Sequence, residues 1–194
     1  MNGDSIWIQT YSGKLFRPLD PSPRDVCIED IAHALALKCR FTGHCREHMS
    51  VAQHSVIVSL NVPPEDALWG LMHDAGEAYL PDVAKPYKHL VYFKVDRLWK
   101  TFAEVEDAVL EAVATKFEMP IIIPESIKES DRVCLATEAR DQMGPPPKEW
   151  TYIKGCVPFD WTIVPLPWSM AEKLFLARWR ELRTAFACNE RNEA

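Results

Sequence analysis

The sequence lacks the features that mark several large classes of protein. Its 194 residues contain no run of about 18 consecutive apolar residues, the length that a membrane-spanning helix needs. The N-terminal residues show neither the basic start nor the apolar stretch of a secretory signal peptide. Six cysteines are present but none forms a CxxC pair, so we expect reduced thiols and a cytoplasmic protein.

An excess of positive charge is also absent. The chain has 22 Lys and Arg against 28 Asp and Glu, which gives a net charge of -6. A general nucleic-acid-binding protein would present a basic face, so we expect neither a stable nucleic-acid partner nor a membrane partner. A local group of basic residues can still hold a small anionic substrate. Internal repeats are absent too, and 47% hydrophobic residues are ordinary for one globular domain.

The apolar periodicity predicts an all-α fold, a compact helical bundle in which residues 1–194 form a single domain. We expect a small N-terminal β-hairpin at about residues 5–18, an irregular Pro- and Trp-rich loop at about 144–167 and a C-terminal helix at about 169–186. The remaining helices are predicted at 28–40, 51–60, 65–80, 93–118 and 125–143.

A histidine and an aspartate, His73 and Asp74, stand side by side in an otherwise apolar helical stretch. Adjacent helical residues point about 100° apart, so they share a partner only if it lies beside the helix between them. His54 lies among apolar residues of the preceding helix, and Asp131 begins the apolar face of a later one. Each residue alone is more often a hydrogen-bonded structural residue. Together, on three helices, they form a ligand set suited to Zn²⁺, Mn²⁺, Fe²⁺ or Co²⁺.

These residues carry a resemblance to a known family. The order H…HD…D, within the segments VAQHS, LMHDAGEAYLPDVAKPYK and IKESDRVCLATEAR, resembles the HD-domain phosphohydrolase superfamily. Within it, the sequence is similar to bacterial 5'-deoxynucleotidases and phage dATP triphosphohydrolases over roughly residues 10–185. The resemblance implies an HD-domain bundle with one divalent ion, Zn, Mn, Co or Fe, and a further Mg or Co ion that accompanies the substrate. The implied ligands of the first ion are His54, His73, Asp74 and Asp131.

The resemblance also implies catalytic carboxylates. Glu77 would orient or deprotonate the attacking water, and its spacing from His73 and Asp74 places it on the same helix face. Asp82, just after Pro81, would act as an acid to the leaving oxygen or as a ligand of a second ion. Solvated surface charge is the alternative interpretation of both carboxylates.

An anionic substrate needs cations, and three basic residues match phosphate-contacting positions in the nucleotide-cleaving relatives: Arg40, Lys88 and Lys128. Arg40 is the strongest candidate, because a guanidinium suits bidentate phosphate recognition. Phe41 is the candidate wall against which a base stacks, with Pro86 as an opposing contact. The alternatives are solvated lysines and ordinary core packing of Phe41.

The implied activity is metal-dependent hydrolysis of a (deoxy)nucleotide at the α-phosphorus, with dATP or another dNTP as substrate and triphosphate as product. A 5'-deoxynucleotidase that acts on dNMPs is the alternative. A different class is a non-catalytic nucleotide-binding or signalling HD protein, against which Glu77 and Asp82 argue; a third is a cyclic-nucleotide phosphodiesterase of the same superfamily. We also expect a homo-oligomer, a dimer or higher.

Overall fold

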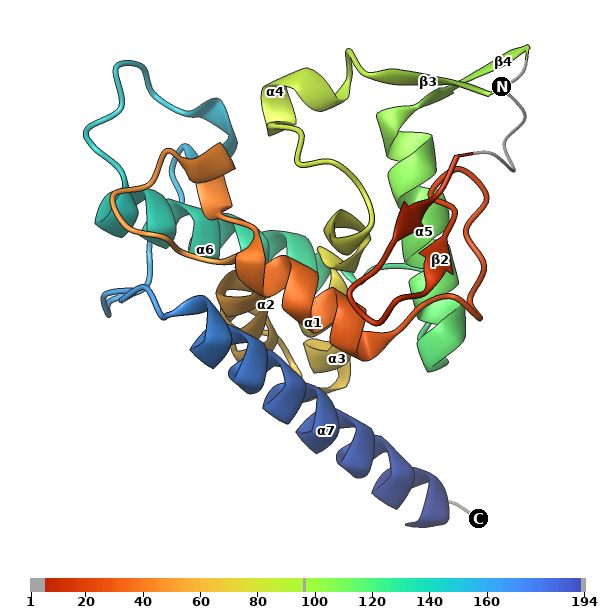
Figure 1. The fold of residues 1–194 in the computed structure, drawn as a ribbon. Coiled ribbons are helices and arrows are strands. Elements are labelled where there is room, and N and C mark those ends of the chain that lie inside the picture. The colour runs from red at the N-terminus through yellow and green to blue at the C-terminus, as the bar shows by residue number, and fades with distance from the viewer. Residues whose placement is uncertain (1–5, 96, 193–194) are drawn as a thin grey trace.

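The computed structural model describes residues 6–95 and 97–192, with 186–192 described by their backbone alone. Within these residues the fold is mostly helical, with seven α-helices and two small two-stranded hairpins (Figure 1). The all-α class predicted from the sequence is therefore confirmed. No helix in the described ranges is both long enough and apolar enough to cross a membrane.

The elements follow one another along the chain without forming a large sheet. The α-helices are α1 (Ile28–Leu37), α2 (Val51–Leu60), α3 (Ala67–Met72), α4 (Lys85–Lys88), α5 (Phe102–Phe117), α6 (Glu125–Gln142) and α7 (Trp168–Asn192). The short 3-10 helices are η2 (Arg40–Gly43), η3 (Pro64–Asp66), η4 (Ala75–Ala78) and η5 (Thr151–Ile153). The hairpins pair β1 (Ile8–Gln9) with β2 (Leu15–Phe16) and β3 (Tyr92–Val95) with β4 (Leu98–Thr101), both antiparallel.

Helix α2 forms the centre of the core. It begins at the predicted cap, where the Ser50 hydroxyl accepts a hydrogen bond of 3.1 Å from the Gln53 backbone amide. The helix is buried around most of its circumference, because α1, α3, α6 and α7 all pack against it. In Figure 1, α7 crosses beneath α1, α2 and α3 and extends beyond the bundle.

The crossing of α2 and α3 depends on a glycine. A Cβ atom at Gly70 would lie 2.8 Å from the Ser59 Cα atom, closer than side chains approach a backbone. Ser59 also donates a 2.8 Å hydrogen bond to the Ala67 carbonyl, and Arg178 of α7 donates to the Ser59 hydroxyl at 3.0 Å. The backbones of α2 and α3 are therefore in contact.

The single helix predicted over 65–80 is broken in the structure. Helix α3 ends at Met72, and η4 begins at Ala75. The His73 ring donates through Nδ1 to the Gly70 carbonyl at 2.8 Å, and so competes for an oxygen that a continuing helix would use. Asp74, with φ -99° and ψ 10°, leaves helical geometry.

The long helix predicted over 93–118 begins only at Phe102. The residues before it form the β3–β4 hairpin, in which Phe93 pairs with Lys100. Aromatic and β-branched residues in this stretch favour strands over a helix. Thr101 then starts α5 with a capping box, because its hydroxyl accepts from the Glu104 amide at 3.1 Å and Glu104 accepts from the Thr101 amide at 2.6 Å.

The other predicted boundaries fall close to the observed ones. The β1–β2 hairpin lies within the range predicted at 5–18, of which residue 5 is outside the described residues. The loop predicted at 144–167 contains η5 as its regular element, and α7 extends from Trp168 past residue 186 to Asn192.

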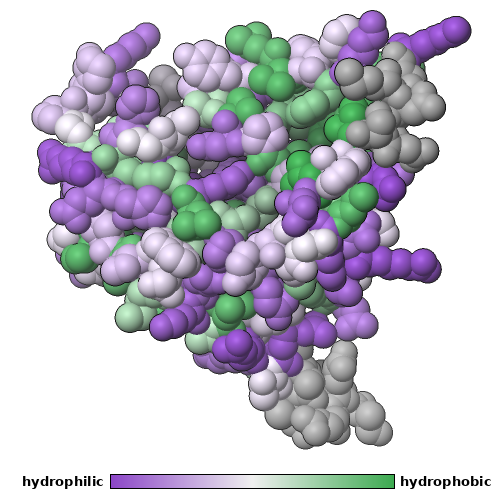
Figure 2. Space-filling view, in the orientation of Figure 1, coloured by the Kyte–Doolittle hydropathy of each residue, from purple (hydrophilic) through white to green (hydrophobic). Residues whose placement is uncertain are grey.

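The face shown in Figure 2 is largely hydrophilic, with apolar side chains gathering toward its upper part, where Figure 1 places α4 and β3. The exposed apolar residues of α4 and the second hairpin, with their neighbours, are Tyr87, Leu90, Tyr92, Leu98 and Trp99. The homo-oligomer expected from the sequence stays a prediction.

Candidate metal centre

Four side chains converge beside the middle of α2. The Nε2 atom of the fully buried His54 lies 3.1 Å from His73 Nε2 and 3.2 Å from Asp131 Oδ1 on α6. The Asp74 Oδ2 atom lies 3.4 Å from His73 Nε2 and 3.6 Å from His54 Nε2. The break between α3 and η4 thus lets adjacent residues, His73 and Asp74, point at one place.

The hydrogen bonds of the Nδ1 atoms of His54 and His73 determine whether their Nε2 atoms, which face each other, can act as acceptors. His73 Nδ1 contacts the Gly70 carbonyl, which can only accept, so Nδ1 carries the proton. His54 Nδ1 lies 2.7 Å from Glu138 Oε1. Burial opposes ionisation of Glu138, but the guanidinium of Arg40 and the imidazole of His54 lower its pKa, so this carboxylate also accepts. In the neutral rings, both Nε2 lone pairs therefore face inward.

The two carboxylates at this place are ionised. Burial opposes ionisation of Asp74, but the neighbouring imidazoles and Arg40 lower its pKa. The same balance holds for Asp131, where burial is outweighed by the hydrogen bond from His54 and by nearby positive charge, so its pKa is also lowered. With both rings neutral, two lone pairs and two carboxylates would meet there, and the hydrogen bond to Asp131 forms only when His54 Nε2 carries a proton.

A cation relieves this convergence of acceptors. Burial and Arg40 oppose a proton on His54, but Glu138 raises the pKa of His54 well above its usual value. One proton on His54 Nε2 satisfies only part of the group, whereas a metal ion satisfies every member. Ligand atoms with bonds of about 2.1 Å lie roughly 3.0–3.4 Å apart in octahedral or tetrahedral geometry. His54, His73 and Asp74 form a group that can hold a metal ion, and Asp131 borders it.

A second group of potential ligands adjoins the opposite edge of the His54 ring. Cys134 Sγ lies 3.4 Å from His54 Nδ1 and 3.5 Å from Glu138 Oε1, and all three residues are buried. Burial raises the pKa of the Cys134 thiol, which disfavours the thiolate that binds metals. The Arg40 guanidinium already supplies a positive charge to Glu138. The Nε2 edge is therefore better suited to a metal ion.

Glu77 extends from η4 next to this group and is mostly buried. Burial, and then the negative charge of Asp74, raise the pKa of Glu77 to about 7. The Lys88 ammonium on α4 lies 3.8 Å from Glu77 Oε1 and donates a 2.7 Å hydrogen bond to Glu106 on α5. At neutral pH Glu77 can therefore both accept and donate a proton.

The backbone that carries Glu77 is anchored by Lys38, at the end of α1. Its half-buried ammonium donates to the carbonyl of Glu77 and, at 2.6 Å, to that of Leu80. Lys38 also lines a cavity of about 450 Å³. The other residues that line it come from the first hairpin and its neighbours, from η4 and the residues after it, and from β3: Ile6, Ile8, Pro18, Leu19, Ala78, Tyr79, Leu80, Pro81, Phe93 and Lys94.

Arg40 and Phe41 lie in η2, where the chain turns sharply. The guanidinium of Arg40 reaches to 3.6 Å from Asp74 Oδ2, at the edge of the four-residue group. Phe41 has a φ of 55°, in the left-handed region, and its ring centroid lies 5.9 Å from that of Trp150. The loop predicted at 144–167 therefore contributes an aromatic neighbour to Phe41.

The remaining predicted site residues lie at the surface. Asp82 is exposed just after η4, and Pro86 is exposed on α4. Lys128 is 65% exposed on the first turns of α6 and pairs with Glu125 at 2.7 Å. Over the described part of the chain, none of these three makes a hydrogen bond or ion pair with the four converging side chains.

Glu138 was not predicted from the sequence, although a signal was present. It stands seven residues after Asp131, which is close to two helical turns and places both on one face of α6. Cys134, three residues after Asp131, shares this face. The helical spacing of Cys134 and Glu138 from Asp131 is therefore the signal in the sequence for the residues that contact the far edge of the His54 ring.

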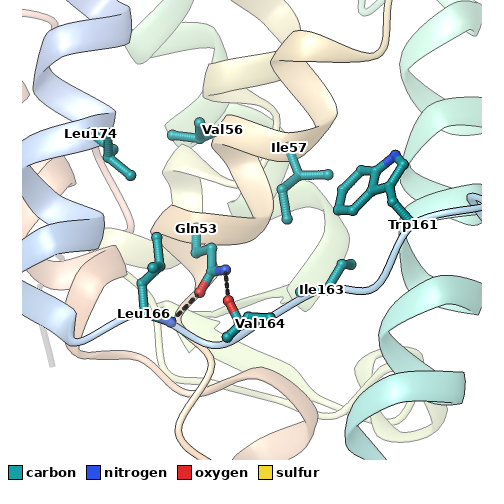
Figure 3. Close-up of a pocket in the computed structure, with 8 residues that line it drawn as sticks. All are labelled: Gln53, Val56, Ile57, Trp161, Ile163, Val164, Leu166 and Leu174. Carbon is teal, nitrogen blue, oxygen red and sulfur yellow. Dashed lines mark hydrogen bonds between the residues drawn. The ribbon is translucent and has the colours of Figure 1, made fainter.

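A separate cavity of about 210 Å³ is lined almost entirely by apolar residues, as Figure 3 shows. Its polar member, Gln53, donates to the Val164 carbonyl at 2.8 Å and accepts from the Leu166 amide at 2.9 Å. These bonds attach the end of the 144–167 loop to α2 at Gln53, the residue that precedes His54. None of the predicted site residues lines this cavity.

No family model matches the sequence. The chain is 33% identical over 183 residues to the uncharacterized protein YfdR of Escherichia coli K12, covering 94% of this chain and 98% of that one. It is also 32% identical over 143 residues to the uncharacterized protein RCAP_rcc00048 of Rhodobacter capsulatus, covering 69% of each. The fold and the site together define the class of this protein: it is mostly helical and has a buried group of potential metal ligands. Within that class, the chain belongs to the family of YfdR.

Proposed function

We propose that this protein is a metal-dependent phosphohydrolase that cleaves (deoxy)nucleotides at the α-phosphorus. The observation that carries the proposal is the convergence of two inward-facing imidazoles and two carboxylates beside the mostly buried Glu77. The sequence resemblance to HD-domain phosphohydrolases supports the same activity.

His54, His73, Asp74 and Asp131 would hold a divalent ion, Zn, Mn, Co or Fe, to which nitrogen and oxygen ligands of this kind are suited. Such an ion, when bound, activates water and neutralises charge on a phosphoryl oxygen. A further Mg or Co ion that arrives with the substrate is part of the proposal.

Proton transfer is the proposed task of two carboxylates. Glu77 takes the proton of the attacking water, and its pKa of about 7 suits a general base at neutral pH. Asp82 delivers a proton to the leaving oxygen of the nucleoside, and its exposed position just after η4 leaves it accessible to a substrate.

The cations near the metal-binding group would hold the phosphates. Arg40 lies nearest to Asp74 and is placed at the reacting phosphate, while Lys88, beside Glu77, takes the next one. Phe41, next to Trp150, and Pro86 would contact the base. Lys128 is 65% exposed on α6, and we place it at the far end of a bound polyphosphate.

This distribution of cations bears on the choice of substrate. A dNTP that releases triphosphate is the proposed substrate, and Arg40, Lys88 and Lys128 together would hold its chain of phosphates. The exposure of Lys128 favours a second candidate, a 5'-deoxynucleotidase that acts on dNMPs, because Arg40 and Lys88 suffice for a single phosphate.

A nucleotide panel tests the proposal. The protein is incubated with each dNTP and dNMP in the presence of Mn²⁺, Co²⁺, Zn²⁺ or Mg²⁺, and phosphate, pyrophosphate and triphosphate are measured separately. We expect deoxynucleoside and intact triphosphate from a dNTP, with none from the Asp131→Asn variant. Phosphate from dNMPs alone would establish the second candidate. Nucleotide binding without turnover under every metal would contradict both and support a signalling protein.

A further inference from the structure

We propose that Glu138 is a positioning residue that fixes the His54 imidazole and the Arg40 guanidinium at once, so that the metal-binding and phosphate-binding parts of the site share one carboxylate. This inference rests on the proposed function and adds a residue to it. Glu138 is fully buried, and each of its oxygens serves a different partner.

The first oxygen fixes the chemistry of His54. Glu138 Oε1 lies 2.7 Å from His54 Nδ1, so the ring donates its proton there and turns the Nε2 lone pair toward His73 and Asp131. A carboxylate behind a histidine ligand typically fixes the ring and raises its basicity toward the metal. Without this acceptor, the ring is free to place its proton on Nε2, where it would block metal binding.

The second oxygen fixes the direction of Arg40. Glu138 Oε2 accepts a 3.0 Å hydrogen bond from Nε of the guanidinium and forms an ion pair with Nη2, also at 3.0 Å. Because the guanidinium is planar, two contacts on one edge set the direction of the remaining N–H groups. Nη1 then points to the edge of the metal-binding group, 3.6 Å from Asp74 Oδ2. A phosphate bound to the metal would meet these N–H groups.

Both partners of Glu138 are donors, which gives a sharp expectation for the nearly isosteric Glu138→Gln variant. An amide offers one accepting oxygen and one donating nitrogen. In the variant, the amide nitrogen must face either His54 Nδ1 or the Arg40 guanidinium. Its N–H group then points at another N–H group, and neither buried donor has an acceptor. As a result, either the His54 imidazole or the Arg40 guanidinium is no longer held in place.

The experiment compares four variants of the full chain with the wild type: Glu138→Gln, Arg40→Met, the double variant Arg40→Met/Glu138→Gln, and Glu129→Gln as a control. Glu129 lies on the same helix but is 62% exposed and pairs with Arg132. Co²⁺ affinity is measured by competition with a chromophoric chelator, and nucleotide affinity by equilibrium binding and KM. Circular dichroism verifies that each variant is folded.

We expect Glu138→Gln to weaken Co²⁺ binding by about 10–100-fold, the usual cost of losing a partner behind a ligand, and to raise KM. Arg40→Met should raise KM without weakening Co²⁺ binding. In the double variant, KM should match that of Arg40→Met, because Glu138 acts on phosphate only through the guanidinium. Its Co²⁺ affinity should recover toward wild type, since the amide oxygen can then face His54.

Two results would overturn the proposal. One is a folded Glu138→Gln variant whose Co²⁺ affinity and KM match those of Glu129→Gln. The other is a double variant in which the two effects on KM multiply. If Glu138→Gln does not fold, the comparison of the double variant with Arg40→Met decides, because no buried guanidinium is left unpaired there. Absence of hydrolysis with every nucleotide would refute the proposed function, whereas the Co²⁺ titration would still test the link between Glu138 and His54.

Discussion

Helix α6 carries two kinds of charged side chain, and their surroundings differ completely. Asp131, near its middle, is 25% exposed, and Glu138, about one turn from its C-terminal end, is fully buried; both contact His54. On its first turns, Lys128 is 65% exposed and, among the described residues, pairs with Glu125 alone. Charges that packing removes from water interact strongly with their neighbours, whereas exposed charges are screened. The effects of substitutions should therefore fall from the buried group outward.

The largest effect is expected at Asp74, whose removal takes a carboxylate from the buried group. Asp74→Ala should lose bound metal and reduce hydrolysis by more than about 10⁴-fold, beyond the worth of a single general base. The metal content of each protein is measured by elemental mass spectrometry after gel filtration. Asp107→Asn, an exposed aspartate on α5, is the matched control and should retain both properties. Full metal content in Asp74→Ala would exclude it as a ligand.

The next effect is expected at Glu77, which lies beside the group without being one of its four members. Glu77→Gln should reduce turnover by about 10²–10⁴-fold, the usual contribution of a positioned general base. Bound metal should be unchanged. Loss of metal would make Glu77 a ligand, and near-normal turnover would return it to the class of ordinary buried acids.

A smaller effect is expected at Lys88, which sits between the buried group and the surface. A charge-assisted contact to phosphate is worth about 1.5–3 kcal/mol, so Lys88→Met should reduce kcat/KM for a dNTP by roughly 10–100-fold. Lys85, an exposed neighbour on α4 that stacks over the Tyr152 ring, provides the control Lys85→Met. An equal loss with a dNMP would place Lys88 at the α-phosphate and favour the 5'-deoxynucleotidase candidate.

The same contrast explains what could be predicted from the sequence. His54 and Asp131 stand out because they interrupt apolar helical spacing, and the structure brings them together on α2 and α6. The break that points His73 and Asp74 at one place could not be predicted, because it depends on a ring-to-carbonyl hydrogen bond within one turn. Metal binding itself stays a prediction.

The elements around the site were harder to predict than its centre. The β3–β4 hairpin was mistaken for the start of α5, because a short stretch of mixed aromatic and charged residues fits both periodicities. Glu138 was missed because a glutamate near a helix end is usually exposed, although its spacing of seven residues from Asp131 was visible. Packing of α6 against α2, which local sequence does not encode, is what buries Glu138.

The smallest effect is expected at Lys128, and it separates the two candidate substrates. Because this lysine is exposed and already paired, Lys128→Ala should lower hydrolysis of a dNTP by less than about fivefold. Hydrolysis of a dNMP should not change, because Lys128 makes no hydrogen bond or ion pair with Arg40 or Asp131 among the described residues. The measurement is kcat/KM for both substrates at two salt concentrations, since a screened contact weakens as salt rises. A loss of more than tenfold with the dNTP would mean that the bound polyphosphate shields Lys128 from water, and the site would then extend along α6. No loss with either substrate would confine phosphate recognition to Arg40 and Lys88.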